Sequence, residues 1–143
     1  MGCDMKKYDD PYLLRFCRAR KFKLDKILEM WKKFQKWRVD NEVDKIGEFE
    51  LTEMPQVRPY YPHGYFRTCK QGRPVYIERV GQFKVKEIFK ITTQQRMVKY
   101  YIKSYERLVT HILPSCTKAA GKRVDQTVTI LDLKGASMSM MSG

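Results

Sequence analysis

Residues 127–135, which run Thr-Val-Thr-Ile-Leu-Asp-Leu-Lys-Gly, give the strongest strand signal in this chain. Four β-branched residues precede a leucine and a glycine closes the run, a composition typical of a β-strand. Side chains alternate across a strand, so Thr127 and Thr129 share one face with Leu131. A strand this apolar is expected to be buried on both faces, where hydroxyls need partners. The two threonines therefore either simply suit a strand or mark a polar spot inside an apolar pocket.

A β-hairpin is expected upstream of this strand. Residues 65–68 and 74–80 are rich in aromatic and β-branched side chains and flank a turn that contains glycine, a pattern typical of a hairpin. On the second arm, alternation puts Tyr76 and Glu78 on the face opposite Val75.

The longest predicted helix lies between the hairpin and the strand. Thr92 with Gln95 matches a capping box at its start. Pro114 is expected to kink or interrupt it, and Gly121 to end it. Its apolar stripe consists of Val98, Tyr101, Ile102, Tyr105, Leu108, Val109 and Ile112. A short helix is expected before it, at 85–90. A hairpin, a crossover helix and an apolar strand together predict an α/β layer.

The N-terminal residues predict a small helical unit. Asp10 is expected to cap a first helix, with Pro11 at the first helical position and an end near Lys21. A second helix is expected from about Leu24 to Asn41. Its apolar face consists of Leu24, Ile27, Leu28, Trp31, Phe34 and Arg38. Such a unit is too thin to hold much core alone, so it is expected to dock on something larger.

A connecting segment is expected after a short helical piece at 43–50. Residues 54–64 hold three prolines and a glycine, which argues against both a helix and a central strand there.

Length and composition place the chain among ordinary folded domains. It has 143 residues, of which 43% are hydrophobic. No apolar run approaches the ~20 residues of a membrane span, and a signal-peptide core is absent from the N-terminus. The four cysteines form no CxxC pair, which favours reduced thiols in a cytoplasmic protein over disulfides or zinc ligands.

The net charge of +13 favours anionic partners, namely phospholipid head groups, nucleic acid or acidic proteins. Segment 15–38 alone holds ten Lys and Arg against Asp25 and Glu29. This basic segment is either a solvated helix surface or a binding surface.

Catalytic signatures are absent from the sequence. His63 and His111 stand alone, without the neighbours of a zinc site or a nucleophile–base pair, so each is expected to be an ordinary hydrogen-bonded histidine. A dinucleotide fingerprint is also missing. The sequence therefore predicts a protein that is not an enzyme and holds no metal or cofactor.

Six motifs in order give the chain a recognisable family pattern. They are the segments at 14–22 (LRFCRARKF), 36–38 (KWR), 72–76 (GRPVY), 113–116 (LPSC), 119–121 (AAG) and 130–135 (ILDLKG). Together they closely resemble the CRAL-TRIO family, specifically its phosphatidylinositol/phosphatidylcholine transfer proteins. The resemblance implies an N-terminal helical bundle unit over 1–53, followed over 54–143 by an α/β lipid-binding domain that stops after about its first half.

The resemblance also implies which residues bind lipid. In such proteins a buried pocket holds one phospholipid, and tyrosines and strand hydroxyls surround the choline head group. The matching positions here are Tyr65, Tyr76, Tyr105, Thr127 and Thr129. At the position of Thr127 a member of the family has serine, which also carries a hydroxyl. Arg20 matches a residue that contacts the inositol phosphate, and Lys21 lies beside it. The remaining inositol-phosphate contacts of the family fall beyond Gly143, so the phosphatidylinositol site is expected to be incomplete here.

The leading hypothesis is that the protein binds phosphatidylinositol and phosphatidylcholine and exchanges them between membranes without bond chemistry. It is expected to be a monomer that contacts membrane surfaces transiently. Two alternatives stay open. One keeps the fold but takes another apolar ligand, such as a tocopherol or sterol. The other is a nucleic-acid or acidic-partner binding module built on the basic segment 15–38, although that segment lacks a groove-reading motif.

Overall fold

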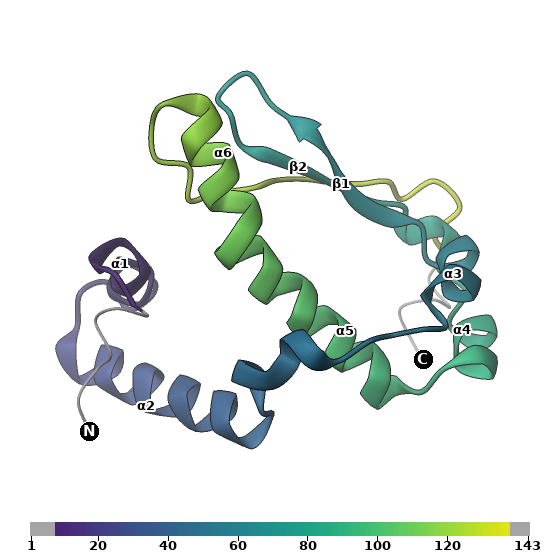
Figure 1. The fold of residues 1–143 in the computed structure, drawn as a ribbon, viewed down its shortest axis with the longest axis horizontal. Coiled ribbons are helices and arrows are strands. Elements are labelled where there is room, and N and C mark those ends of the chain that lie inside the picture. Colours follow the sequence, from purple (N-terminus) through teal and green to yellow (C-terminus); the bar gives the residue numbers. More distant parts are fainter. Residues whose placement is uncertain (1–7, 138–143) are drawn as a thin grey trace. The chain divides into compact units, whose positions relative to one another are not determined.

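Helices α1 (Asp10–Ala19) and α2 (Leu24–Asp40) form the first of two units in the structure, a computed structural model that describes residues 8–137 (Figure 1). The chain divides into these units between Lys45 and Ile46. The bounds of α2 confirm the predicted second helix to within one residue, and α1 ends two residues before the predicted position.

Asp9 rather than Asp10 caps α1. Its Oδ1 accepts a hydrogen bond from the backbone N–H of Tyr12 at 2.9 Å, and its carbonyl accepts from Leu13 at 3.1 Å. The residue whose carbonyl accepts the first intrahelical bond is the N-cap, so Asp10 takes the first helical position and Pro11 the second. The predicted cap was therefore wrong by one residue.

Aromatic packing holds the first unit together. Phe16 of α1 meets Trp31 and Phe34 of α2, with ring centroids 5.0 to 5.6 Å apart. Arg38 is buried and its Nη2 lies 2.6 Å from Oδ1 of Asp44. Asp44 belongs to the 3-10 helix Val43–Glu48, which confirms the predicted third helical piece. The predicted apolar face of α2 was only partly right, since Leu24 and Leu28 are exposed.

The second unit is built on a three-stranded sheet in the order β1 (His63–Thr68), β2 (Pro74–Glu78) and β3 (Val128–Leu131). Strands β1 and β2 pair antiparallel, and β2 and β3 pair parallel. Parallel neighbours require a crossover connection, and helices provide it here. The predicted hairpin, crossover and α/β class are confirmed.

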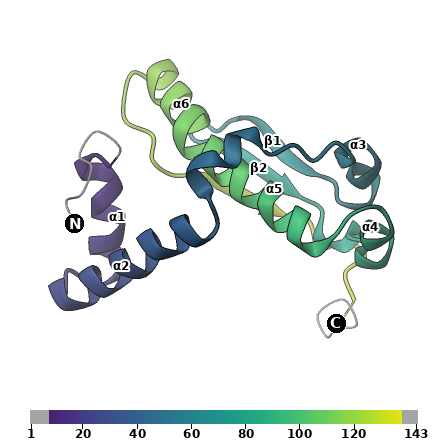
Figure 2. The ribbon, with the colours of Figure 1, turned by 60° about the horizontal axis from the view of Figure 1, so that its bottom comes forward.

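The crossover consists of α4 (Val85–Ile91) and one long helical rod (Figure 2). The rod comprises α5 (Gln94–Arg107), a π-helix (Leu108–Ile112) and α6 (Leu113–Ala120). Pro114 has no N–H and its ring crowds the carbonyl four residues earlier, so the wider π turn just before it is the predicted interruption. Gly121, with a φ of 62°, ends α6 as predicted. In the part of the chain that is described, no helix is both long and apolar enough to cross a membrane.

The start of α5 differs from the predicted capping box. Thr93 is the N-cap, and its Oγ1 accepts from the N–H of Arg96 at 3.3 Å. Thr92 is buried and donates instead to Oε1 of Glu53 at 2.6 Å. A partner distant in sequence thus takes the hydroxyl that the local pattern assigned to the cap, and the box with Gln95 does not form.

The segment predicted as a plain connection contains a short helix. Helix α3 (Met54–Val57) is followed by the 3-10 helix Arg58–Tyr60, and a proline lies in the first two positions of each. Proline fits there because those N–H groups have no partner within the helix. The segment also supplies core, because Val57 and Tyr61 are buried with Ile88 and Met97.

Strand β3 is more exposed than its sequence predicts. It spans four residues and pairs only with β2 among the described strands, so Ile130 and Leu131 are 48% and 55% exposed. The expectation of burial on both faces was therefore wrong. The apolar stripe predicted for the long helix was also partly wrong. Val98 is exposed, whereas Met97, which was not predicted as part of the stripe, is buried.

An ion-paired cluster fastens the residues before α3 to the start of α5. Arg96 donates from Nε to Oε1 of Glu53 at 2.6 Å and from Nη2 to Oε2 at 2.8 Å. These hydrogen bonds, led by that of Arg96, lower the pKa of Glu53 from 4.5 to about 2. Paired charged hydrogen bonds of this kind contribute more to stability than neutral ones.

Replacing Glu53 by glutamine is therefore expected to lower the free energy of unfolding at neutral pH by about 1–3 kcal/mol. Because the folded-state pKa is depressed, the contribution is present above pH 4.5 and is lost as the pH falls toward 2. Chemical denaturation of both proteins at several pH values measures the difference. Glu50→Gln, whose side chain is exposed, is the control. A pH-independent difference would contradict the prediction.

Candidate functional site

A cavity of about 780 Å³ lies in the second unit, with walls from the three strands and from α5. All five residues predicted to surround a choline group line it: Tyr65, Tyr76, Tyr105, Thr127 and Thr129. Tyr76 and Glu78, which were predicted to share one face of their strand, both line the cavity, while Val75 is not part of it.

The sheet register arranges three of these residues in a row. Tyr65 of β1 pairs with Tyr76 of β2, and Tyr76 pairs with Thr129 of β3. The two tyrosine rings lie 5.1 Å apart between centroids. One transverse row of the sheet therefore carries two phenols and a hydroxyl into the same cavity.

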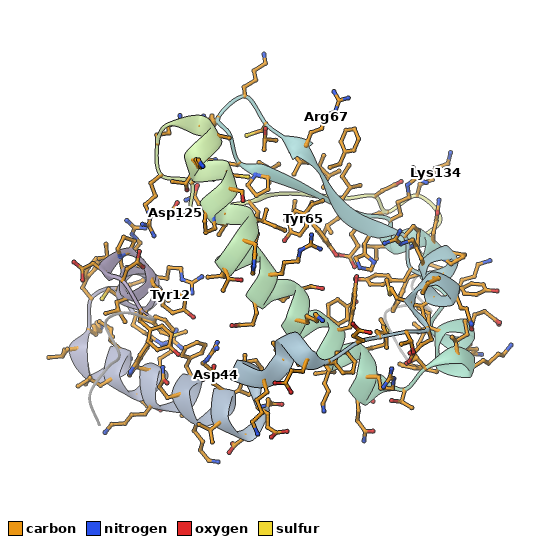
Figure 3. All side chains as sticks on the ribbon, viewed as in Figure 1. Tyr12, Asp44, Tyr65, Arg67, Asp125 and Lys134 are labelled. Carbon is orange, nitrogen blue, oxygen red and sulfur yellow. The ribbon has the colours of Figure 1, made fainter. Side chains whose placement is uncertain are left out.

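A bulge in β1 decides which side chains of this strand face the cavity. The pairing is irregular between Tyr65 and Thr68, and Arg67 has a φ of 54°. Residues two apart in a regular strand share a face, but Figure 3 shows Tyr65 between the sheet and the long helix and Arg67 on the other side of the sheet. The bulge thus keeps a guanidinium out of the cavity.

A second row of polar residues lies beside the first. His63 pairs with Glu78 across β1 and β2. Tyr61 donates from its hydroxyl to Oε1 of Glu78 at 2.7 Å. His63 Nδ1 lies 2.8 Å from the carbonyl of Tyr61, and Nε2 lies 3.1 Å from the hydroxyl of Tyr100. Since a carbonyl only accepts, Nδ1 carries the proton and Nε2 accepts from Tyr100.

Helix α5 closes the cavity opposite the sheet with five polar side chains. They are Tyr100, Tyr101, Ser104, Tyr105 and Arg107, whose spacing places them on one side of a helix. Tyr61 is 2% exposed, whereas Tyr65 and Tyr105 are 38% and 66% exposed. The cavity therefore has an inner end at Tyr61 and an open end at Tyr105.

Burial favours the neutral forms of these groups. It raises the pKa of Tyr61, and the hydrogen bond to Glu78 raises it further. Burial likewise raises the pKa of Tyr65, Tyr76 and Tyr101, so these phenols stay neutral and can donate hydrogen bonds. The pKa of His63 is lowered by burial, so its imidazole is neutral at pH 7. The prediction of a hydrogen-bonded histidine is confirmed at this position.

The cavity combines aromatic rings, neutral hydroxyls, one carboxylate and two arginines, Arg58 and Arg107. Rings attract organic cations, and hydroxyls and guanidinium groups bind phosphate. No cluster of three or more potential metal-binding side chains occurs within residues 8–137. The arrangement suits a ligand with a polar, charged head.

Arg20 and Lys21, the predicted phosphate-binding pair, lie in the first unit at the corner between α1 and α2. Arg20 donates from Nη1 to the carbonyl of Ala19 at 3.2 Å, and both side chains are exposed. Lys21 has a φ of 49°. Their phosphate-binding role stays a prediction.

Sequence reasoning missed several cavity residues, chiefly Tyr61, His63, Glu78 and Tyr100. Glu78 carried a usable signal, because it alternates with Tyr76 on one face of a predicted strand. Tyr100 lies one turn before Ser104 on the predicted helix, and this spacing was also available. Tyr61 follows two prolines in a segment predicted as a connection, and its sequence gives no such signal.

Two domain families match this chain. Residues 2–33 match the CRAL/TRIO N-terminal domain and residues 59–142 match the CRAL/TRIO domain. The chain is 47% identical over 134 residues to the SEC14 cytosolic factor of Kluyveromyces lactis, covering 93% of this chain and 44% of that protein. It is 45% identical over 134 residues to the phosphatidylinositol/phosphatidylcholine transfer protein SFH7 of Arabidopsis thaliana, covering 92% of this chain and 24% of that protein.

A third relative, the SEC14 cytosolic factor of Yarrowia lipolytica, is 45% identical over 135 residues, which are 94% of this chain and 27% of that protein. The chain thus spans between about a quarter and just under half of the length of these relatives. The family expected from the six motifs is confirmed. This chain belongs to the CRAL/TRIO family.

Proposed function

We propose that the whole protein binds phosphatidylinositol and phosphatidylcholine and carries them between membranes without catalysing a reaction. The observation that carries the proposal is the gathering of three tyrosines and two threonines, from four separate elements of the fold, around one cavity of about 780 Å³. Two relatives give further support, since one is named a phosphatidylinositol/phosphatidylcholine transfer protein and the other a SEC14 cytosolic factor.

Each class of cavity residue has a role in this proposal. The rings of Tyr65, Tyr76 and Tyr105 attract the quaternary ammonium of choline through cation–π interactions, and their hydroxyls donate hydrogen bonds to the head group. The hydroxyls of Thr127 and Thr129 donate to the phosphate. Arg20, with Lys21 beside it, binds the inositol phosphate, for which the bidentate guanidinium is suited.

The partners follow from the same proposal. The protein acts in the cytoplasm as a monomer, and it contacts membrane surfaces only while it exchanges a lipid. A net charge of +13 supports this, because basic proteins are attracted to the anionic cytoplasmic leaflet. We also propose that the helical domain ends at residue 53 and that the lipid-binding domain begins at residue 54.

Mass spectrometry of lipids that co-purify with the full-length protein tests the proposal. Both phosphatidylinositol and phosphatidylcholine are expected, and the absence of both would overturn it. Recovery of a tocopherol or sterol alone would favour a different apolar ligand on the same fold.

A double variant, Tyr65→Phe with Tyr105→Phe, separates these ligands further. It removes two hydroxyls and keeps both rings, so phosphatidylcholine loading is expected to fall by roughly fivefold for each lost hydrogen bond. Loading measured with radiolabelled phosphatidylcholine vesicles gives the change. Tyr60→Phe, a tyrosine that is not among the residues lining the cavity, is the control. Unchanged phosphatidylcholine loading would contradict the assigned roles.

A further inference from the structure

The inner end of the cavity holds a carboxylate that no predicted role explains. Glu78 lines the cavity from β2 and accepts a hydrogen bond at 2.7 Å from Tyr61, which is 2% exposed. This bond fixes one carboxylate oxygen and leaves the group facing the cavity. A charge-assisted bond to a buried phenol orients the carboxylate firmly.

Arg58 and Arg107 line the same cavity, but within residues 8–137 neither forms an ion pair with Glu78. Glu78 accepts its side-chain hydrogen bond from Tyr61, and no lysine or histidine of residues 8–137 forms an ion pair with it either. His63, its neighbour across the strands, already uses both ring nitrogens, toward the carbonyl of Tyr61 and the hydroxyl of Tyr100. A partly buried carboxylate without a cationic partner is unfavourable, so a positively charged group brought by a ligand would be stabilised here.

The surroundings of Glu78 suit an organic cation in particular. Tyr61 and Tyr101 have ring centroids 5.9 Å apart, and Tyr100 and Tyr101 lie 6.1 Å apart. Tyr76 precedes Glu78 by two residues on the same face of β2 and lines the same cavity. A carboxylate among aromatic faces combines ionic attraction with cation–π attraction, the arrangement that recognises ammonium groups.

We infer that Glu78, oriented by Tyr61, is the anionic partner of a positively charged ligand group and selects phospholipids that carry an ammonium head. This inference rests on the proposed function and extends it, because it adds a charge-selective residue to the rings and hydroxyls. Choline and ethanolamine heads satisfy the requirement. Inositol lacks a cation, so its lipid does not depend on Glu78.

The test is a cycle of one substitution in the protein and one in the lipid. Full-length protein and Glu78→Gln, which keeps the shape of the side chain, are loaded from vesicles that contain phosphatidylcholine or its uncharged 3,3-dimethylbutyl analogue. The wild type is expected to prefer choline, and E78Q to lower that preference about tenfold. Phosphatidylinositol loading is expected to stay the same. Glu50→Gln is the control, and it should change neither the preference for choline over the analogue nor the loading of phosphatidylinositol.

Each result has a distinct meaning. If wild-type protein loads neither natural lipid, the proposed function fails. The inference about Glu78 is overturned if wild-type protein loads both natural lipids and E78Q keeps the full preference for choline over the analogue. It is also overturned if E78Q loses phosphatidylcholine and phosphatidylinositol loading equally. Glu78→Asp retains the charge and is expected to keep most of the preference, which covers the case in which E78Q does not fold. Loss of the preference in E78D would count against the inference.

Discussion

Replacing Ile88 by alanine is expected to lower the free energy of unfolding of the second unit by about 2–5 kcal/mol. Ile88 is 1% exposed and belongs to the core cluster with Val57, Tyr61 and Met97. Removing its side chain leaves a cavity that the rigid neighbours on α3 and α5 refill only partly, so lost burial and lost contacts add together.

The matched control for Ile88 is the next residue. Phe89 is 48% exposed on the same helix, so Phe89→Ala should change the unfolding free energy by less than about 1 kcal/mol. Urea denaturation followed by circular dichroism at 222 nm measures both variants. Because Tyr61 contacts the same core, Ile88→Ala should also weaken lipid loading. Equal stability losses at the two positions would show that the core is not centred on Ile88.

Replacing Gly81 by alanine is expected to displace the residues that follow β3 and to destabilise the protein by about 1–3 kcal/mol. A Cβ atom at this position would lie 2.1 Å from the carbonyl oxygen of Lys134 and 2.7 Å from the backbone nitrogen of Ala136. Both atoms belong to backbone, which has no rotamer to yield, so the segment itself must move. The N–H of Gly81 also donates to the backbone carbonyl of Asp132 at 3.2 Å.

The displacement should reach the cavity through β3. Because Thr129 lies three residues before Asp132, phosphatidylcholine loading should fall together with stability in Gly81→Ala. Gly47→Ala is the control, since a Cβ there meets no atom within 4 Å. Thermal unfolding and vesicle loading give the two readouts. A variant as stable as the wild type would contradict the close approach of these two segments.

Local patterns were sufficient for most helices and for the hairpin. The bounds of the helix Leu24–Asp40 and the interruption near Pro114 depend on neighbours within a turn or two, and both predictions were confirmed. Features that depend on distant residues were not predicted. Thr92 binds Glu53, a residue 39 positions away, so no local motif could show that Thr93 would be the cap.

The candidate site was predicted to a similar degree. The resemblance supplied five cavity residues because it aligned this chain to a pocket already built from separate elements. It did not supply Glu78 and Tyr61, which meet across 17 positions. The exposure of β3 was also missed. The burial of a strand depends on how many strands and helices lie next to it, and residue composition alone does not reveal how many there are.

The parallel pairing of β2 and β3 has a consequence for how the protein is made. Tyr65 and Tyr76 can pair as soon as the hairpin leaves the ribosome, but Thr129, which completes their row, lies 53 positions after Tyr76. At roughly 5–20 residues per second, synthesis of that crossover takes several seconds. During this interval one edge of β2 is unpaired and the cavity lacks its third strand, so the newly made hairpin presents an open strand edge until β3 is synthesised.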